Sequence, residues 1–284
     1  MKLDEARVVL RPRNLSEIFD LALRFATDPA AKLYAKLGAL TLLPAWGLTL
    51  AARWGLGWDW GLVWLLALAL VTPIQGVFTV AVGRMMFAEE VSVAEVLGQY
   101  LRRLPAYIGA LFVTRVMIGV MSLGFFLVIP PLWMWGRCTY IHEACLLEQA
   151  GPVEAVSRAS RMINRNVMSA VALLLMLTLA AAAFVFVAES LLNDGLLEFV
   201  LQVGRPFGSL FDEGGSAAAL LGLFLAVPYW ATVRFLAYVD LRTRRDGWDV
   251  QLRFMAIQAA IQASGAAAAE SRAGLRVEPE GARA

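Results

Sequence analysis

Six long apolar stretches alternate with short polar segments along this chain, and the alternation predicts its fold. The strongest stretch, residues 60–83, contains no ionisable side chain. It exceeds the ~20 residues that an α-helix needs to cross a ~30 Å hydrocarbon core. We therefore expect an all-α, polytopic membrane bundle of six transmembrane helices, at residues 34–52, 60–83, 106–127, 129–147, 167–188 and 217–238.

The third and fourth predicted spans are separated only by Pro130 and Pro131. The uncharged run between Arg115 and Arg137 also fits a single span with a proline kink. However, the basic segments before and after this region are expected to share a compartment, which requires an even number of crossings between them. We therefore predict a tight helical hairpin that turns at Pro130 and Pro131.

The basic residues fall almost entirely on one side of this predicted membrane topology. Twenty of the 25 Lys and Arg lie in segments that the topology places together, whereas Arg53 and Arg205 lie on the opposite side. Cytoplasmic loops of membrane proteins carry an excess of Lys and Arg. Both the N-terminus and the C-terminus are therefore predicted to be cytoplasmic.

Amphipathic segments are expected to border the spans, within residues 1–33 and near residues 91–104, 152–164 and 191–204. The first three are cytoplasmic, and each contains an acid followed seven residues later by arginine: Glu17 and Arg24, Glu95 and Arg102, Glu154 and Arg161. This pattern is compatible with three repeats of an interfacial helix and a helical hairpin. It is equally compatible with unrelated juxtamembrane helices, which are commonly amphipathic and basic.

The last span closes a predicted transmembrane domain of residues 34–241, and a dense charged motif follows it. We expect residues 242–263 to form a cytoplasmic amphipathic helix and residues 264–284, rich in Ala, Gly and charge, to be disordered. Two acid–base pairs in the motif have the i,i+4 spacing of neighbours on a helix. The motif consists of Asp240, Arg242, Arg244, Arg245, Asp249 and Arg253.

Composition supports the membrane assignment, because 60% of residues are hydrophobic and only 17% are charged. Soluble domains average about 45–50% and 25%. The start of the chain, residues 1–14, lacks the apolar core of a signal peptide, so no cleavage is expected. Cys138 and Cys145 lie on one predicted helix about 10 Å apart, beyond the ~7 Å that a disulfide spans.

Catalytic motifs are not recognisable in the sequence. His142 is the only histidine, and neither a phosphate-binding Gly-Lys-Ser/Thr loop nor a Gly-x-Ser-x-Gly elbow occurs. Cys138, His142 and Cys145 share a helix face, but three ligands along one straight helix do not converge on one metal ion. We expect no catalytic residue, no metal, no cofactor and no nucleic-acid partner.

Ionisable residues within the predicted spans are the strongest candidates for a site. A charge near the bilayer centre costs at least about 2.5–3.5 kcal/mol, so it usually faces protein or water and has a partner. We expect Glu143 to pair with Arg115 or Arg137, assisted by Tyr140. Two interpretations stay open: a polar cavity that receives an anionic group, or structural ion pairs that fix helix register. The candidate cluster, among spans three, four and six, is Arg115, Arg137, Tyr140, His142, Glu143 and Arg234.

Three segments together resemble the glycerophosphoryl diester phosphodiesterase membrane-domain family. They are Leu10 to Asp20 (LRPRNLSEIFD), Leu147 to Arg161 (LEQAGPVEAVSRASR) and Tyr238 to Val250 (YVDLRTRRDGWDV). The resemblance, which frames about residues 10–260, implies a six-span bundle of the bacterial cytoplasmic (inner) membrane. Members named for the enzyme carry a separate soluble catalytic domain. No such domain is recognised in this sequence, so the resemblance does not imply phosphodiesterase activity.

These observations predict a non-enzymatic membrane scaffold or accessory subunit. Its amphipathic helices and basic motif would recruit a protein partner, from the membrane or the cytoplasm, or anionic lipid headgroups at the cytoplasmic face of the bilayer. The alternative hypothesis is a transporter, channel or lipid-handling protein that uses a polar cavity among the third, fourth and sixth spans. The two hypotheses differ in whether the intramembrane charges converge on an open cavity.

Overall fold

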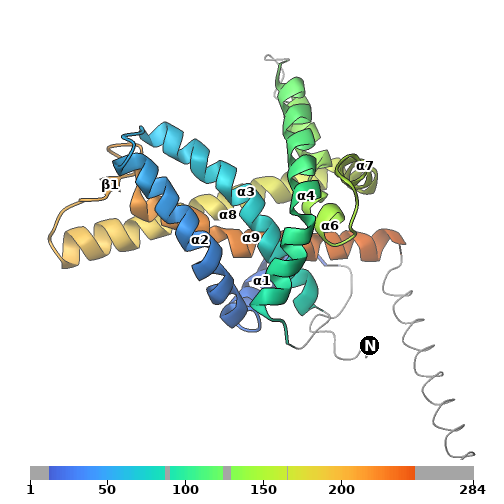
Figure 1. The fold of residues 1–284 in the computed structure, drawn as a ribbon, viewed down its shortest axis with the longest axis horizontal. Helices are drawn as coiled ribbons and strands as arrows, with labels where there is room; N and C mark the ends of the chain where they lie inside the picture. Colours follow the sequence, from blue (N-terminus) through green and yellow to red (C-terminus); the bar gives the residue numbers. More distant parts are fainter. Residues whose placement is uncertain (1–12, 87–89, 124–128, 165, 247–284) are drawn as a thin grey trace, which may run out of the picture. The chain divides into compact units, whose positions relative to one another are not determined.

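A computed structural model describes residues 13–86, 90–123, 129–164 and 166–246, which are mostly helical (Figure 1). The chain divides into two compact units, and residues 13–238 form the larger one, which contains the helical bundle. The helices are α1 (Leu15–Thr27), α2 (Ala31–Trp54), α3 (Trp60–Met85), α4 (Val93–Ser122), α5 (Ile129–Arg137), α6 (Ile141–Leu146), α7 (Pro152–Ile163), α8 (Val167–Ala188), the π-helix η2 (Glu189–Val200) and α9 (Ala217–Asp246).

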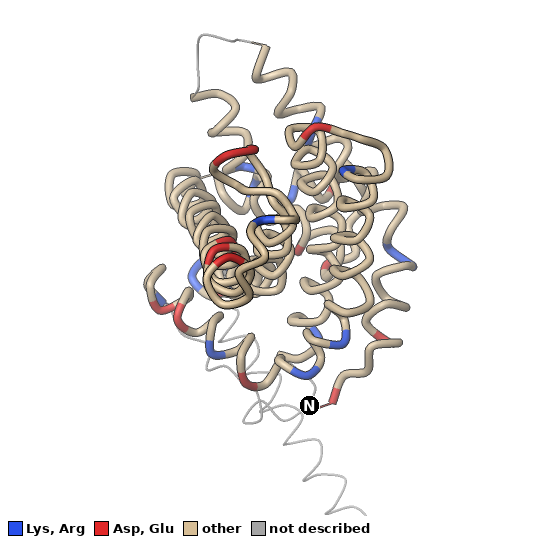
Figure 2. Tube along the Cα trace, turned by 90° about the vertical axis from the view of Figure 1, so that its left-hand side faces the viewer, with Lys and Arg blue, Asp and Glu red and all other residues tan. Residues whose placement is uncertain are grey.

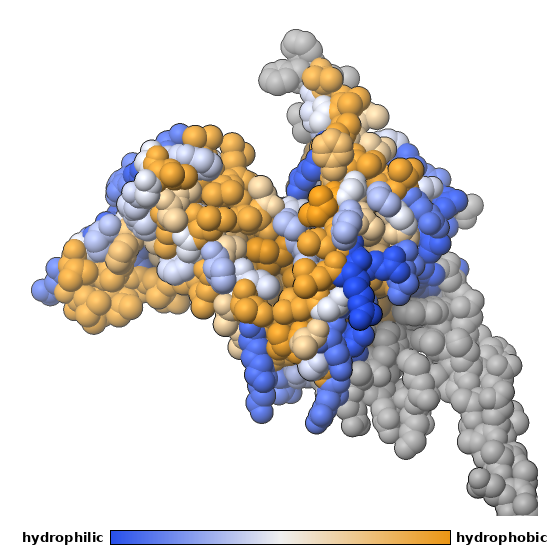
Figure 3. Space-filling model, in the orientation of Figure 1, coloured by the Kyte–Doolittle hydropathy of each residue, from blue (hydrophilic) through white to orange (hydrophobic). Residues whose placement is uncertain are grey.

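Five helices in the described part of the chain are long and apolar enough to cross a membrane: α2, α3, α4, α8 with its continuation η2, and α9. A mostly helical membrane bundle is therefore confirmed. Charged residues form short bands between long uncharged stretches of the chain (Figure 2). A broad hydrophobic surface covers α2, α3 and α4 (Figure 3). These helices expose large apolar side chains such as Leu43, Leu65 and Phe112, as expected for helices that face lipid.

The core of the bundle lies around the second half of α3 and the middle of α9. From Gln75 to Val82 every residue of α3 is buried, which is expected of a helix surrounded by other helices. Gly76 permits this packing, because a Cβ there would lie 2.7 Å from the Tyr107 ring and 3.0 Å from Leu146. Small residues at such positions allow close approach of membrane helices.

Helix α4 corrects the predicted boundary between an interfacial helix at 91–104 and a span at 106–127. The two form one continuous helix, Val93–Ser122, which begins where the Ser92 hydroxyl accepts a hydrogen bond from the Glu95 amide at 3.2 Å. Pro105, which lies between the two predicted segments, is inside this helix. Proline removes one backbone donor, and membrane helices tolerate this loss when their neighbours compensate for it.

The predicted fourth span, residues 129–147, is divided into α5 and α6, neither of which is long enough to cross a membrane alone. The Cys138 amide bonds to both the Met134 and Trp135 carbonyls, so the last turn of α5 tightens. The Thr139 hydroxyl then donates to the Gly136 carbonyl at 2.7 Å. These local bonds provide hydrogen-bond partners for backbone groups at the end of α5, and the helix is interrupted at residues 138–140.

The predicted turn at Pro130 and Pro131 is wrong. Both prolines lie in the first turn of α5, where their missing donors cost nothing. The preceding helix ends earlier, at Ser122, and α4 and α5 pack against each other. The third and fourth predicted spans are thus separate helices, and residues 124–128 between them lie outside the described residues.

The predicted helix at 191–204 is also corrected, because the chain continues from α8 as the π-helix Glu189–Val200 and then leaves the helical conformation. Glu189 is fully buried there. Its carboxylate accepts hydrogen bonds from the Asn193 side chain and the Leu210 amide, both at 2.9 Å, and from the Ser216 hydroxyl. It thus joins η2 to the paired strands β1 (Gly208–Ser209) and β2 (Gly215–Ser216).

Helix α7 confirms the amphipathic helix predicted at 152–164, and it packs on α4, α5 and α6. The Arg158 guanidinium donates to Glu154 at 2.6 Å and to Glu148 at 2.9 Å. Hydrogen bonding to the arginine lowers the pKa of Glu154 below its ordinary value. Ionised Glu154 therefore stabilises the folded protein. This stabilisation is fully present at a pH above the pKa of Glu154 in the unfolded chain, and it is lost as pH falls through the lower pKa of the folded state.

We expect Glu154→Gln to lower the thermal stability of the detergent-solubilised protein slightly at pH 7. The difference from wild type should vanish at a pH below the folded-state pKa, because both side chains are then neutral. Melting curves of both proteins from pH 7 to pH 3 check this. A difference that persists in acid would contradict the assignment. Glu90→Gln, which removes an exposed carboxylate, is the control.

Candidate functional site

A cavity of about 360 Å³ lies among α3, α4, α5, α6, α8 and α9, within the larger unit. This volume falls near the lower end of the roughly 300–1,000 Å³ typical of ligand pockets. Aliphatic side chains and Trp135 form much of the wall. The polar part of the wall consists of Thr72, Gln75, Thr114, Arg115, Cys138, Thr139, His142, Thr178, Trp230 and Arg234.

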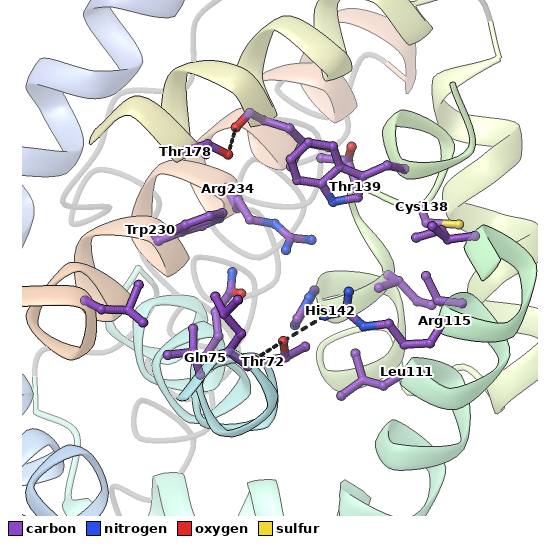
Figure 4. Close-up of a pocket in the computed structure, with 18 residues that line it drawn as sticks. Thr72, Gln75, Leu111, Arg115, Cys138, Thr139, His142, Thr178, Trp230 and Arg234 are labelled. Atoms are coloured by element: carbon purple, nitrogen blue, oxygen red, sulfur yellow. Dashed lines mark hydrogen bonds between the residues drawn. The ribbon is translucent and has the colours of Figure 1, made fainter. Parts of the chain in front are cut away.

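Hydrogen-bond donors dominate this polar wall. The Gln75 side-chain amide nitrogen, the Trp230 indole nitrogen and the Nε and Nη2 of Arg234 are buried and have no hydrogen-bond partner among the described residues. Arg115 and Arg234 extend into the same space from different helices, with His142 near them (Figure 4). Buried donors without partners carry a desolvation cost of about 1–3 kcal/mol each, so an acceptor in the cavity would be strongly favoured.

Arg115, on α4, donates a hydrogen bond from Nη2 to the Thr72 hydroxyl of α3 at 2.9 Å. No carboxylate in the described ranges forms an ion pair with Arg115, although the residue lies within a span and is exposed to the cavity. Its positive charge is thus held at the cavity wall by a neutral neighbour.

Arg234, on α9, pairs with Glu143 of α6 across 3.6 Å between Nη2 and Oε2. Glu143 is fully buried and Arg234 nearly so, and neither carboxylate oxygen has a hydrogen bond among the described residues. The predicted pairing of Glu143 with Arg115 or Arg137 is therefore wrong. The formal charges of Arg234 and Glu143 cancel, which leaves Arg115 as the charge of the cavity wall that has no ion-pair partner among the described residues.

His142 links the cavity to the core, because its Nδ1 and the Tyr107 hydroxyl form a hydrogen bond. The same hydroxyl lies 3.0 Å from the Thr72 carbonyl oxygen, which accepts from it. Tyr107 is fully buried, so these contacts fix the ring of His142 in the wall. An imidazole held in this way offers its second nitrogen as a polar contact for an occupant.

Two predicted cluster residues lie outside the cavity wall. The Arg137 guanidinium stacks over the Trp133 ring at 4.5 Å, a cation–π contact that accommodates its charge. The Tyr140 ring packs edge-on against Tyr238, with 5.9 Å between the ring centroids. The structure therefore brings Arg115, His142 and Arg234 together at the cavity, pairs Glu143 with Arg234, and places Arg137 and Tyr140 outside the cavity wall.

Sequence reasoning missed six polar wall residues: Gln75, Thr114, Thr139, Thr178 and Trp230, and Thr72 as a cavity residue. Thr72 and Gln75 flank Pro73 in an otherwise apolar span. Polar side chains within a span are expensive to keep there, and this signal marks Gln75 as a candidate. Thr178 and Trp230 carry no comparable signal, because isolated Thr and Trp are common in membrane helices.

The C-terminal charged motif belongs to the smaller unit and is described only in part. The predicted pair of Asp240 and Arg244 is confirmed, with 2.8 Å between Oδ2 and Nε. Asp249, Arg253 and the predicted helix 242–263 beyond residue 246 lie outside the described residues, as does the tail 264–284. Recruitment of a partner by this motif remains a prediction.

Within the described ranges, no group of three or more His, Cys, Asp and Glu side chains has the arrangement of a metal site. Comparisons with protein-family models, with curated proteins and with solved structures found no match to this chain. The family resemblance of its three sequence segments stays a prediction, and the function must be inferred from the cavity.

Proposed function

We propose that this protein binds an anionic ligand inside the membrane and acts as a transporter or lipid-handling protein. The observation that carries the proposal is the cavity wall, in which two arginines and further buried donors face an open volume. Such a wall suits an oxyanion, because hydrogen bonds from charged donors to an anion are about twice as strong as neutral ones. An intramembrane ion pair without a cavity would not need these additional donors.

The interrupted helix supports the same function. The break between α5 and α6 contributes Cys138 and Thr139 to the cavity, and His142 follows in the first turn of α6. Non-helical backbone at membrane depth is tolerated where it is enclosed by protein or lines a cavity. Transporters commonly build their substrate sites from helices of this discontinuous kind.

The proposal includes the finer topology of six crossings. With both termini cytoplasmic, α5 and α6 together form the fourth crossing, because five crossings would place the termini on opposite sides. α5 and α6 are then two halves of one interrupted span. The arrangement belongs to a bacterial cytoplasmic membrane, which is also what the sequence resemblance implies.

The proposal predicts that an anion stabilises the purified protein through Arg115. Thermal unfolding in a neutral detergent is measured with dodecanoate, inorganic phosphate or sulfate. At about 100 times its dissociation constant a ligand of the folded state stabilises by about 2.7 kcal/mol. We expect at least one anion to raise the melting temperature of wild type and of Arg137→Gln, and to raise that of Arg115→Gln much less.

Arg137→Gln is a matched control, because it removes an intramembrane arginine that does not line the cavity. If every anion shifts Arg115→Gln as much as wild type, or shifts none of the three proteins, the proposed function is refuted.

A further inference from the structure

The cavity opens at the depth of the hydrocarbon core. Leu68, Arg115 and Thr178 are the wall residues on α3, α4 and α8 that are exposed. Thr178 lies near the middle of α8 and Thr72 near the middle of α3, about 15–20 Å from either helix end at 1.5 Å per residue. A ~30 Å hydrocarbon core surrounds spanning helices at this depth. The mouth of the cavity therefore faces lipid tails instead of water.

The charge at this mouth is not compensated by the described protein. A charge near the bilayer centre costs at least about 2.5–3.5 kcal/mol, and Thr72 offers Arg115 only a neutral acceptor. Because Glu143 neutralises Arg234, one formal positive charge remains for the occupant to balance. A singly charged head group between the two arginines would balance it and would satisfy the unpartnered donors of Arg234 and Gln75.

The remaining wall is apolar. Leu111, Ile118, Leu174 and Leu223 line the cavity beside the donors, and Leu68 lines it at the mouth. Apolar walls with a few fixed polar groups bind molecules that have both characters, the polar groups setting the orientation. The modest volume accommodates one head group and part of one hydrocarbon chain.

We propose that the ligand of this cavity is an anionic amphiphile with one acyl chain, which enters sideways from the bilayer between α3, α4 and α8. Its carboxylate or phosphate head lies between Arg115 and Arg234, and its chain passes Leu68 toward the lipid. This inference rests on the proposed function and specifies the ligand class and its route.

The test varies the charge and the hydrocarbon chain of the ligand separately. Binding of radiolabelled dodecanoate, acetate, inorganic phosphate and neutral dodecanol is measured on protein in phosphatidylcholine nanodiscs, with empty nanodiscs as background. We expect saturable binding of dodecanoate alone, weakened about tenfold or more by Arg115→Gln and largely restored by Arg115→Lys, which keeps the charge. Gel filtration and circular dichroism establish that each variant is folded.

The route is tested at the mouth. Leu68→Trp should slow dodecanoate association, whereas Leu65→Trp, on the same helix but outside the wall, should not. A bromine-labelled dodecanoate should also quench tryptophan fluorescence, and the quenching should decrease in Trp135→Phe and Trp230→Phe, which remove wall tryptophans. This second measurement locates the chain even if Leu68→Trp does not fold.

The outcomes separate the two proposals. Arg115-dependent binding of acetate or phosphate as tight as that of dodecanoate would overturn the amphiphile inference and leave the proposed function intact. Equal binding of dodecanol, or quenching unchanged in both tryptophan variants, would also overturn the inference. If no anion binds in an Arg115-dependent way, both proposals fail.

Discussion

Replacing Glu143 with alanine should destabilise the folded protein by about 3–5 kcal/mol, the cost of leaving a buried charge without its partner. Arg234 is nearly inaccessible, and among the described residues Glu143 is the only carboxylate that forms an ion pair with it. Without Glu143 the guanidinium remains in the bundle with no carboxylate partner among the described residues. Unfolding by a denaturing detergent, followed by circular dichroism, measures the loss.

The double variant Glu143→Leu, Arg234→Met distinguishes the ion pair from simple packing. Apolar residues of similar volume often replace a buried pair at little cost, so the double variant should be more stable than Glu143→Ala. Equal destabilisation in both would attribute the loss to packing and not to the unpaired charge of Arg234. Glu154→Ala, which removes a half-exposed carboxylate on α7, should change stability only slightly, because exposed ion pairs contribute little.

Replacing Glu189 with alanine should release the segment that contains β1 and β2. The Leu210 amide and the Ser216 hydroxyl lose their acceptor, and the Asn193 side chain keeps only its hydrogen bond to the Gly208 carbonyl. Hydrogen bonds to charged groups contribute about 1.5–3 kcal/mol each, so the local free energy of opening should fall by about 3 kcal/mol or more. Hydrogen–deuterium exchange over residues 208–216 should accelerate about a hundredfold or more, and mass spectrometry of peptides measures it.

Glu198→Ala is the matched control for this change. Glu198 lies on the same π-helix, is exposed and bonds to Arg205 at 2.7 Å, and Arg205 also contacts Asp194 and Asp212. Its loss should therefore change exchange over residues 208–216 only slightly. Equal acceleration in the two variants would mean that Glu189 does not anchor the segment.

The lengths of the apolar stretches in the sequence alone predicted most of the fold. Residues 34–52, 60–83, 167–188 and 217–238 lie within α2, α3, α8 and α9, because long apolar runs have no stable alternative to a helix in lipid. The fourth span could not be predicted in detail. Its interruption depends on the Thr139 hydroxyl and on bifurcated bonds of the Cys138 amide, which hydropathy does not report.

The candidate site could be predicted only as a set of residues. The free-energy cost of placing a charge in the membrane identified Arg115, Glu143 and Arg234 as candidates. Arg115 and Arg234 line the cavity, and Glu143 pairs with Arg234 behind the wall. Their pairing could not be predicted, because it depends on which faces of α4, α6 and α9 meet. The same cost did not predict the surroundings of Arg137, because its guanidinium makes a cation–π contact with Trp133 and has no need of a carboxylate.

The division between α5 and α6 determines how this part of the bundle can deform. α5 packs on α8, whereas α6 packs on α3, and both contact α4 and α7. Rotation about the backbone at residues 138–140 can therefore move one half while the other keeps its neighbours, as at a hinge. Because Cys138, Thr139 and His142 lie at this joint, such a rotation would widen or narrow the space beside Arg115 without breaking a helical turn.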